Sequence, residues 1–344
     1  MKYFKLKEIS EIKNGEQCNY SDKGIIPVYG SNGIIGYTDD LNAPENSIII
    51  GRVGANAGSV FYSLKKHWVS DNAISVVPNV NKVNPFYLYY ALFNLDLNRL
   101  VEGSAQPLIN QSILNSFEIS VPSLSVQTSV IEKIRVFDEK IAINNQINDN
   151  LLDIAQNIYH RILFSSQITK TNLRSFATVI MGQSPSSKTY NENKIGIPLL
   201  NGAADFRNGI HPSKWTTDPK IIVNKGAYIF GVRATIGLTT KVSKPYAIGR
   251  GTGSAIPKDV NNEEILYFIL NDMFKKFEQT ESGSVYINIS KNDFQNYTFN
   301  IPDKIVLLFF HEKVKPIMDR IYINKKENKI LQAIKAVLLD RYFD

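Results

Sequence analysis

The chain has 344 residues, of which 43% are hydrophobic, and one cysteine, Cys18, so it is a globular protein of about two domains without an intrachain disulfide. The net charge of +7 is uneven, because residues 1–164 carry −2 and residues 165–344 carry +9, which gives only mild support for a nucleic-acid partner. The N-terminus lacks the apolar core of a secretory signal and no apolar run could cross a bilayer, so we expect a cytoplasmic protein.

Along the chain, two β-rich modules alternate with two long helices, which predicts an α+β fold. Each module contains short apolar runs separated by Gly, Asn-Gly and Pro, a pattern typical of strands joined by tight turns. One helix interrupts each module, and a strand ending in proline closes it. The expected bounds are 1–122 and 166–302 for the modules, 85–97 and 263–277 for the helices inside them, and 123–165 and 303–344 for the long helices.

The second half of the chain repeats the first. From Gly103 onward, residue n matches residue n+180 without a gap, so that Pro122 corresponds to Pro302. Upstream, the match continues at other offsets, as between Ile9–Gly15 and Phe176–Gly182. The module starts have therefore diverged in length while the remainder has not, as expected of a variable reading module on a constant frame.

Both long segments carry a heptad seam, with apolar residues spaced alternately by four and three, which is typical of a coiled coil. The seam is Val130, Ile134, Phe137, Ile141, Asn144, Asn148, Leu151, Ala155, Ile158 and Ile162 in the first, and the residues 180 positions later in the second. A buried seam asparagine costs stability but fixes register, because a shifted partner leaves its amide unpaired. The alternative is that each long helix packs only on its own module.

We expect the two long helices to pair antiparallel, with Asn144 and Asn148 facing Asn324 and Asn328 near the middle. About 40 helical residues make a rod roughly 60 Å long. Antiparallel pairing would place the two modules at opposite ends of that rod, related by a pseudo-twofold axis.

At full length this arrangement resembles the specificity subunit of Type I restriction-modification enzymes. The closing signature of each half carries the resemblance: a Gly-Ser loop, a strand, a proline, a glutamine and a long helix. Gly103–Gln106, Pro122 and Gln127 provide it in the first half, whereas Leu307 replaces the glutamine in the second. The resemblance implies two target recognition domains, each reading one half of a split, asymmetric sequence in double-stranded DNA.

The resemblance also implies that this chain is not an enzyme and holds no cofactor. Two methylation subunits would dock on the long helices, carry S-adenosylmethionine and methylate adenine, and restriction subunits would cleave. The helices would then act as a ruler that separates the half-sites.

Reading bases in the major groove requires Arg, Lys, Asn, Gln, Ser or Thr on exposed loops. Arg52 and Arg233 follow equivalent strands beside glycines, which lets the backbone approach DNA closely. We place Lys65 and Lys66 in a hairpin with His67. A solvated or structural role for each residue is the alternative. The DNA-binding candidates are Arg52, Asn56, Lys65, Lys66 and Gln106 in the first module, and Arg207, Lys214, Arg233, Arg250 and Tyr286 in the second.

Two other functions have some support. The segment Asn84-Pro85-Phe86-Tyr87 resembles the Asn-Pro-Pro-Tyr motif of adenine methyltransferases, but the second proline is missing and the glycine cluster 249–253 does not open a helix. Proline in the first turn of a helix is also common. A coiled-coil scaffold would explain the heptads but not the modules. The four histidines lack metal-ligand spacing, and we expect His160 and His311, in the long helices, to be surface or packing residues.

Overall fold

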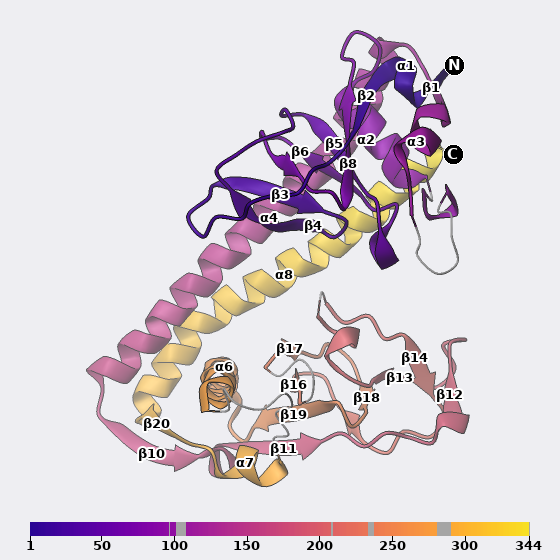
Figure 1. Ribbon diagram of the computed structural model, residues 1–344. Coiled ribbons are helices and arrows are strands. Elements are labelled where there is room, and N and C mark those ends of the chain that lie inside the picture. Colours follow the sequence, from indigo (N-terminus) through magenta and orange to yellow (C-terminus); the bar gives the residue numbers. More distant parts are fainter. Residues whose placement is uncertain (96, 101–107, 208, 233–236, 281–289, 344) are drawn as a thin grey trace. The chain divides into compact units, whose positions relative to one another are not determined.

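The computed structural model describes residues 1–95, 97–100, 108–207, 209–232, 237–280 and 290–343 (Figure 1). The chain divides into two compact units, the first formed by residues 1–144 with 326–344 and the second by residues 145–325. Each unit holds one β-rich module together with part of both long helices, so the α+β fold is confirmed.

The first unit contains nine described strands and three described short helices. The strands are β1 (Lys2–Lys5), β2 (Ser10–Asn14), β3 (Ile26–Gly30), β4 (Gly33–Thr38), β5 (Ser47–Gly51), β6 (Val60–Ser63), β7 (Trp68–Val69), β8 (Ala73–Pro78) and β9 (Glu118–Val121). The helices are α1 (Leu6–Ile9), α2 (Pro85–Asn94) and α3 (Gln111–Ser116), with 3-10 turns at Gly54–Asn56 and Leu97–Leu100. The sheets have the orders β2-β8-β5-β6, β4-β3-β7 and β1-β9.

Strand β5 lies at the centre of this unit, and all five of its residues are buried. Ile48 and Ile50 point into the main core, where they meet Leu88 of α2, while Ile49 points the other way into a smaller cluster with Val69. Successive side chains of a strand face opposite sides, so a strand buried on both faces needs an uninterrupted apolar run. Burying each of these isoleucines contributes about 1.5–3 kcal/mol.

The second unit repeats this plan with additions. Its strands are β10 (Ile168–Asn172), β11 (Ala177–Met181), β12 (Tyr190–Asn191), β13 (Ile197–Leu200), β14 (Lys214–Thr216), β15 (Ile222–Val223), β16 (Tyr228–Gly231), β17 (Thr239–Lys241), β18 (Tyr246–Ile248), β19 (Thr252–Pro257) and β20 (Thr298–Pro302). Its short helices are α5 (Leu173–Phe176), α6 (Glu263–Thr280) and α7 (Lys291–Asn296), with 3-10 turns at Ser187–Thr189, Ala203–Asp205 and Val260–Asn262. The sheets have the orders β11-β19-β16-β17, β12-β14-β13-β18-β15 and β10-β20.

The repeat seen in the sequence is also a repeat of structure. Sheet β11-β19-β16-β17 matches β2-β8-β5-β6 strand for strand. Each unit also contains one parallel strand pair in its second sheet, β3 with β7 in the first unit and β13 with β18 in the second. The divergence in length falls between β11 and β16. There the short turn of residues 31–32 becomes the connection 201–213, and β12 and β15 widen the sheet.

The long helices are α4 (Leu124–Ser165) and α8 (Lys304–Phe343). In the first unit they run antiparallel, because Asp138 of α4 contacts Lys335 of α8 while Asn144 contacts Asn328. Every seam residue of both helices is buried or half-buried. The antiparallel pairing predicted from the heptads is therefore confirmed, and the helix α8 continues through Pro316.

Asparagine amides meet at this helix–helix contact in both units. In the first unit, Asn144 Nδ2 donates to Asn328 Oδ1 at 2.8 Å and to Glu327 Oε2 at 2.8 Å. In the second, Asn324 Nδ2 donates to Asn148 Oδ1 at 2.9 Å. Asn144 Oδ1 and Asn324 Oδ1 are buried and have no hydrogen-bond partner within the described residues. Each pair thus gains one amide hydrogen bond and strands one carbonyl oxygen.

Candidate nucleic-acid interface

Four loops of the first unit converge where strands β2, β3, β5 and β7 end and β8 begins. Backbone bonds hold them together, since Arg52 N donates to Asn72 O at 2.9 Å and Glu16 N to Val69 O at 3.0 Å. Ser31 Oγ also donates to Asn72 O, at 2.5 Å. We call residues 15–17, 31–33, 52–58 and 70–72 the first loop edge.

Arg52 lies at the centre of the first loop edge. It is half-buried, and its Nη1 donates to Asp71 O at 3.3 Å, while its Nε is buried without a partner among the described residues. Asn56 is exposed in the 3-10 turn Gly54–Asn56 nearby. A guanidinium held by one backbone carbonyl keeps donors available for an acceptor outside the chain, such as a guanine edge or a phosphate.

The second unit builds an equivalent edge from different residues. Gln183 N donates to Ile248 O at 3.0 Å, and Gly251 N donates to Asn201 O at 3.0 Å. These bonds bring together the ends of β11, β13 and β18, which correspond to β2, β3 and β7. We call residues 182–184, 201–207, 249–251 and Lys214, which pairs with Leu199 near the end of β13, the second loop edge.

Three cationic candidates gather at the second loop edge. Arg250 is exposed, and its Nε donates to Ser184 Oγ at 3.4 Å. Lys214 is exposed at the start of β14, opposite the end of β13, and its Nζ lies 5.9 Å from the Tyr190 ring centroid. Arg207 is exposed in the connection between them. This grouping concentrates positive charge where phosphate would be attracted.

A buried aspartate shapes the connection that carries Arg207. Asp205 Oδ2 accepts from Asn201 N at 2.8 Å, and its Oδ1 accepts from Ser213 Oγ at 3.2 Å. The carboxylate therefore joins the two ends of the connection. Sequence reasoning did not single out Asp205, although an Asp that begins a turn-rich segment is a common local acceptor.

Two close backbone approaches give the loop edges their shape. A Cβ atom added to Gly15 would stand 2.1 Å from Ser70 O, and one added to Gly182 would stand 2.2 Å from Gly249 O. The two glycines occupy the same place in the repeat, at the ends of β2 and β11. Both positions therefore require glycine, because any side chain would collide with a backbone oxygen. This explains why the repeated segments Ile9–Gly15 and Phe176–Gly182 both end in glycine.

Not every candidate lies on a loop edge. The predicted hairpin at Lys65 and Lys66 is wrong, because β6 pairs with β5 whereas β7 pairs in parallel with β3 in another sheet. Ser63 pairs with Ser47 at the start of β5, so these lysines lie at the end of the strand away from Arg52. They are exposed, whereas His67 is fully buried, and burial lowers the pKa of its imidazole. Gln106, Arg233 and Tyr286 lie outside the described residues.

The segment Asn84-Pro85-Phe86-Tyr87 has a local structural role. Asn84 Oδ1 accepts from Phe86 N at 3.0 Å and from Tyr87 N at 3.2 Å, which caps α2, and Pro85 takes the first helical position. This is the common way to begin a helix. The resemblance to a methyltransferase motif is therefore explained by helix capping.

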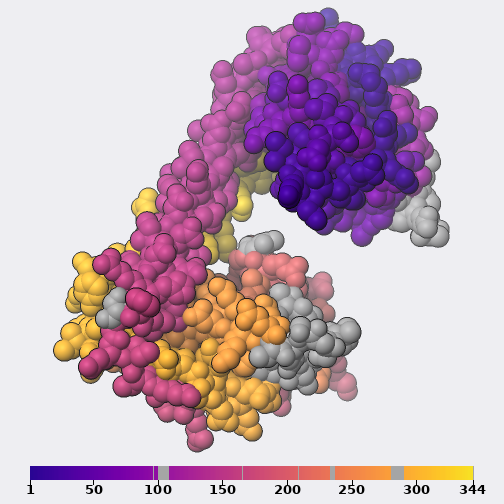
Figure 2. All heavy atoms as spheres, turned by 60° about the vertical axis from the view of Figure 1, so that its left-hand side comes forward, coloured from indigo at the N-terminus to yellow at the C-terminus, as the bar shows by residue number. Residues whose placement is uncertain are grey.

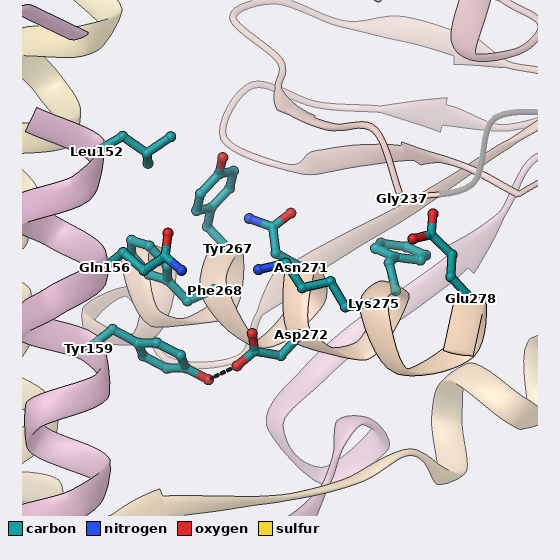
Figure 3. A pocket seen from close by; sticks show the side chains of 11 residues that line it. Leu152, Gln156, Tyr159, Gly237, Tyr267, Phe268, Asn271, Asp272, Lys275 and Glu278 are labelled. Atoms are coloured by element: carbon teal, nitrogen blue, oxygen red, sulfur yellow. Dashed lines mark hydrogen bonds between the residues drawn. The ribbon is translucent and has the colours of Figure 1, made fainter. Parts of the chain in front are cut away.

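A cavity of about 210 Å³ lies between α4 and α6 in the second unit (Figure 3). Tyr159 OH donates to Asp272 Oδ2 at 2.8 Å on its wall, and Lys275 and Glu278 also line it. Two carboxylates against one ammonium group do not attract phosphate. Among the described residues, no group of His, Cys, Asp or Glu could hold a metal ion.

Sequence reasoning also missed a buried polar contact between each module and its long helix. Gln127 is buried and joins α4 to the cap of α2, and His311 of α8 contacts Glu264 of α6. Burial raises the pKa of the Glu264 carboxyl, and the hydrogen bond from His311 partly opposes that rise. Gln127, the glutamine of the closing signature, could have indicated the first contact from the sequence. No sequence pattern indicated the contact between His311 and Glu264.

Within each unit, the paired segments of α4 and α8 have an apolar side that faces away from the module of that unit. With the seam residues as positions a and d, the c and g positions of both helices lie on one side of the pair, whereas e positions such as Asp138 and Leu339 face the module. Figure 2 shows a view in which α4 side chains lie at the surface along much of the helix. We call the exposed apolar c and g residues the outer apolar face. They are Val126, Val136, Ile143, Ile330, Ile334 and Val337 in the first unit and Ile147, Ile154, Phe164, Phe309 and Ile323 in the second.

No helix in the described part of the chain is long and apolar enough to span a membrane. The sequence matches the family described as Type I restriction modification DNA specificity domain over residues 1–153 and 166–336.

Two curated proteins and one solved structure are similar over most of the chain. The putative type I restriction enzyme MjaX specificity subunit of Methanocaldococcus jannaschii is 26% identical over 298 residues, which cover 78% of this chain and 69% of that protein. The Type I restriction enzyme HindI specificity subunit of Haemophilus influenzae is 20% identical and covers 81% of each chain. The Type I restriction-modification S subunit from M. genitalium shares the fold, with a TM-score of 0.65 at 18% identity, covering 100% of this chain and 96% of that one.

Proposed function

This chain belongs to the Type I restriction-modification specificity family, the non-catalytic subunits that recognise the DNA target site, and from that premise we propose which parts of it read DNA. The first loop edge reads one half-site through Arg52 and Asn56. The second loop edge reads the other half-site through Arg207, Lys214 and Arg250.

The observation that carries this proposal is one scaffold, present twice, with different residues at the same edge. Arg52 directly follows β5 in the first unit, whereas Arg250 lies in the turn after β18 in the second. Two unlike edges on like scaffolds suit an asymmetric, divided site. The domain assignment that fits is recognition domains 1–122 and 166–302, with helical regions 123–165 and 303–344.

The long helices set the separation of the half-sites. With 42 and 40 residues, α4 and α8 are each about 60 Å long. Half-sites read by a twofold arrangement lie about 34–36 Å apart, one turn of DNA. The asparagines at the helix–helix contact fix the register, since a shifted pairing would leave buried amides without partners.

The outer apolar face is where the methylation subunits bind. Contiguous exposed apolar residues usually mark an interaction surface. One such stretch in each unit supports two methylation subunits for each specificity chain. Those subunits would carry S-adenosylmethionine and methylate adenine, and restriction subunits would add cleavage.

Sequencing of adenine methylation in host DNA, with and without this gene, tests the proposal. One asymmetric, divided motif should disappear on deletion, and exchange of residues 172–302 for those of another chain should rewrite one half of it. Arg52→Ala and Arg250→Ala should each relax one half only, at a cost of about 1–3 kcal/mol per lost base contact. If no motif changes while the methylation subunit is expressed, the proposal is wrong and a scaffold role takes its place.

A further inference from the structure

In the first unit, a buried amide ties the module to the long helix at the first turn of α2. Gln127 Oε1 accepts from Asn84 N at 2.7 Å, and its Nε2 donates to Pro122 O at 2.8 Å. Because Asn84 caps α2, this one side chain joins α2, the end of the β9 strand and α4. Gln127 is 1% exposed, so water does not compete for either bond.

The second unit has a tie of the same kind, made by different residues one helical turn further along. Leu307 stands at the position of Gln127 and is buried in the apolar core. Four residues later, His311 Nδ1 lies 2.5 Å from Glu264 Oε2, in the first turn of α6. The residue that corresponds to His311 in the first repeat is Ile131, which is buried and apolar. The polar residue thus stands at the first of these two positions in the first unit and at the second in the second unit. In both units it makes a polar link to the start of the module helix.

Each module helix makes a second polar contact with the long helices. In the first unit Tyr90 OH of α2 donates to Asp138 of α4, whose Oδ1 lies 2.6 Å from Lys335 Nζ of α8. In the second unit the roles are reversed, because Tyr159 of α4 donates to Asp272 of α6 (Figure 3). Two separated contacts fix both the position and the rotation of a helix, whereas one contact would let it pivot.

We propose that Gln127 in the first unit and the His311–Glu264 pair in the second are positioning residues that set the spacing between the two half-sites. This inference rests on the proposed function. Helix α2 packs on β5 and β8, and helix α6 packs on β19, and these strands lead directly into the loop edges, so a helix that pivots moves part of its loop edge.

The geometry of DNA makes spacing a sensitive measure of that movement. One extra base pair displaces a half-site by about 3.4 Å along the DNA and about 35° around it. A module that is held firmly cannot reach the displaced half-site, so the altered spacer is methylated less. A module that can pivot reaches both spacings. A purely space-filling residue at either position would have no such effect, because apolar packing alone would satisfy it.

The test uses the full chain in complex with its methylation subunits. The substrate is a plasmid library in which the two half-sites are separated by the native spacer or by one that is one base pair shorter or longer. Sequencing then gives the methylated fraction for each spacer. Gln127→Leu and His311→Leu remove the ties, and the matched control His311→Gln keeps an N–H donor for Glu264.

Both leucine variants should keep their base preferences and lose spacing preference. Discrimination against the altered spacers should fall by about tenfold, as expected for loss of a buried hydrogen bond. His311→Gln should stay within about twofold of the wild type, because it retains the bond.

Leucine variants that melt at a lower temperature but keep the wild-type spacing preference would overturn the inference and leave a purely structural role. Where Gln127→Leu does not fold, Gln127→Glu is measured instead, since it keeps the acceptor for Asn84 N and loses the donor to Pro122 O. An unchanged spacing preference there also counts against the inference. A wild-type complex that methylates no divided site contradicts the proposed function instead, so the two failures are distinguishable.

Discussion

The asparagine pair Asn144–Asn328 allows the net contribution of a buried amide contact to be measured. Asn144→Leu removes the amide that donates to Asn328 Oδ1, and stranding a buried polar atom of this kind costs about 1–3 kcal/mol. The double variant Asn144→Leu/Asn328→Leu removes both amides, including Asn144 Oδ1, which already lacks a partner among the described residues. Replacing both members of a buried polar pair by apolar groups is usually neutral or stabilising.

We therefore expect the free energy of unfolding to fall by about 1–3 kcal/mol in the single variant and to return to the wild-type value or above it in the double variant. Urea unfolding of the full chain, followed by circular dichroism and combined as a double-mutant cycle, measures this. The pair Asn148–Asn324 is the matched control in the second unit and should behave alike. If the double variant loses as much stability as both singles together, the amides contribute net stability and the reasoning is wrong.

Three further predictions concern the loop edges, a buried histidine and the outer apolar face. Gly15→Ala and Gly182→Ala should each abolish reading of one half-site in methylation assays, because the new Cβ meets backbone oxygen, whereas Gly202→Ala has open space and should be tolerated. Burial lowers the pKa of His67 below 6.5, so the stability that its neutral imidazole contributes is present above pH 6.5 and is lost as the pH falls through the lowered pKa. His67→Gln should therefore reduce the fall in the free energy of unfolding between pH 6.5 and lower pH. Ile143→Asp should weaken binding of the methylation subunit without lowering the melting temperature of the free chain, and equal binding would contradict the docking site.

The long helices and their pairing could be predicted because heptad periodicity is a local property of the sequence. The central asparagines could be placed opposite one another since the two seams are of equal length and run antiparallel. The repeat could likewise be found from identity alone, because most of the length difference falls between β11 and β16.

Strand pairing could not be predicted with the same certainty. Lys65 and Lys66 lie between two strands that are neighbours in sequence and belong to different sheets, and local alternation does not say which partner a strand will take. The tie at His311 was missed for a related reason. Its partner Glu264 is 47 residues away, and the matching position in the first repeat is the apolar Ile131.

The shifted ties also limit how the gene can recombine. In a crossover between the two repeats, a junction between codons 84 and 127 would part Asn84 from Gln127. The hybrid would join the first module's helix to Leu307, which offers no acceptor for the Asn84 amide. An exchange that carries over the spacing as well as the half-site therefore includes the first two turns of the long helix that follows each module, so the unit that sets spacing is longer than the recognition domain alone.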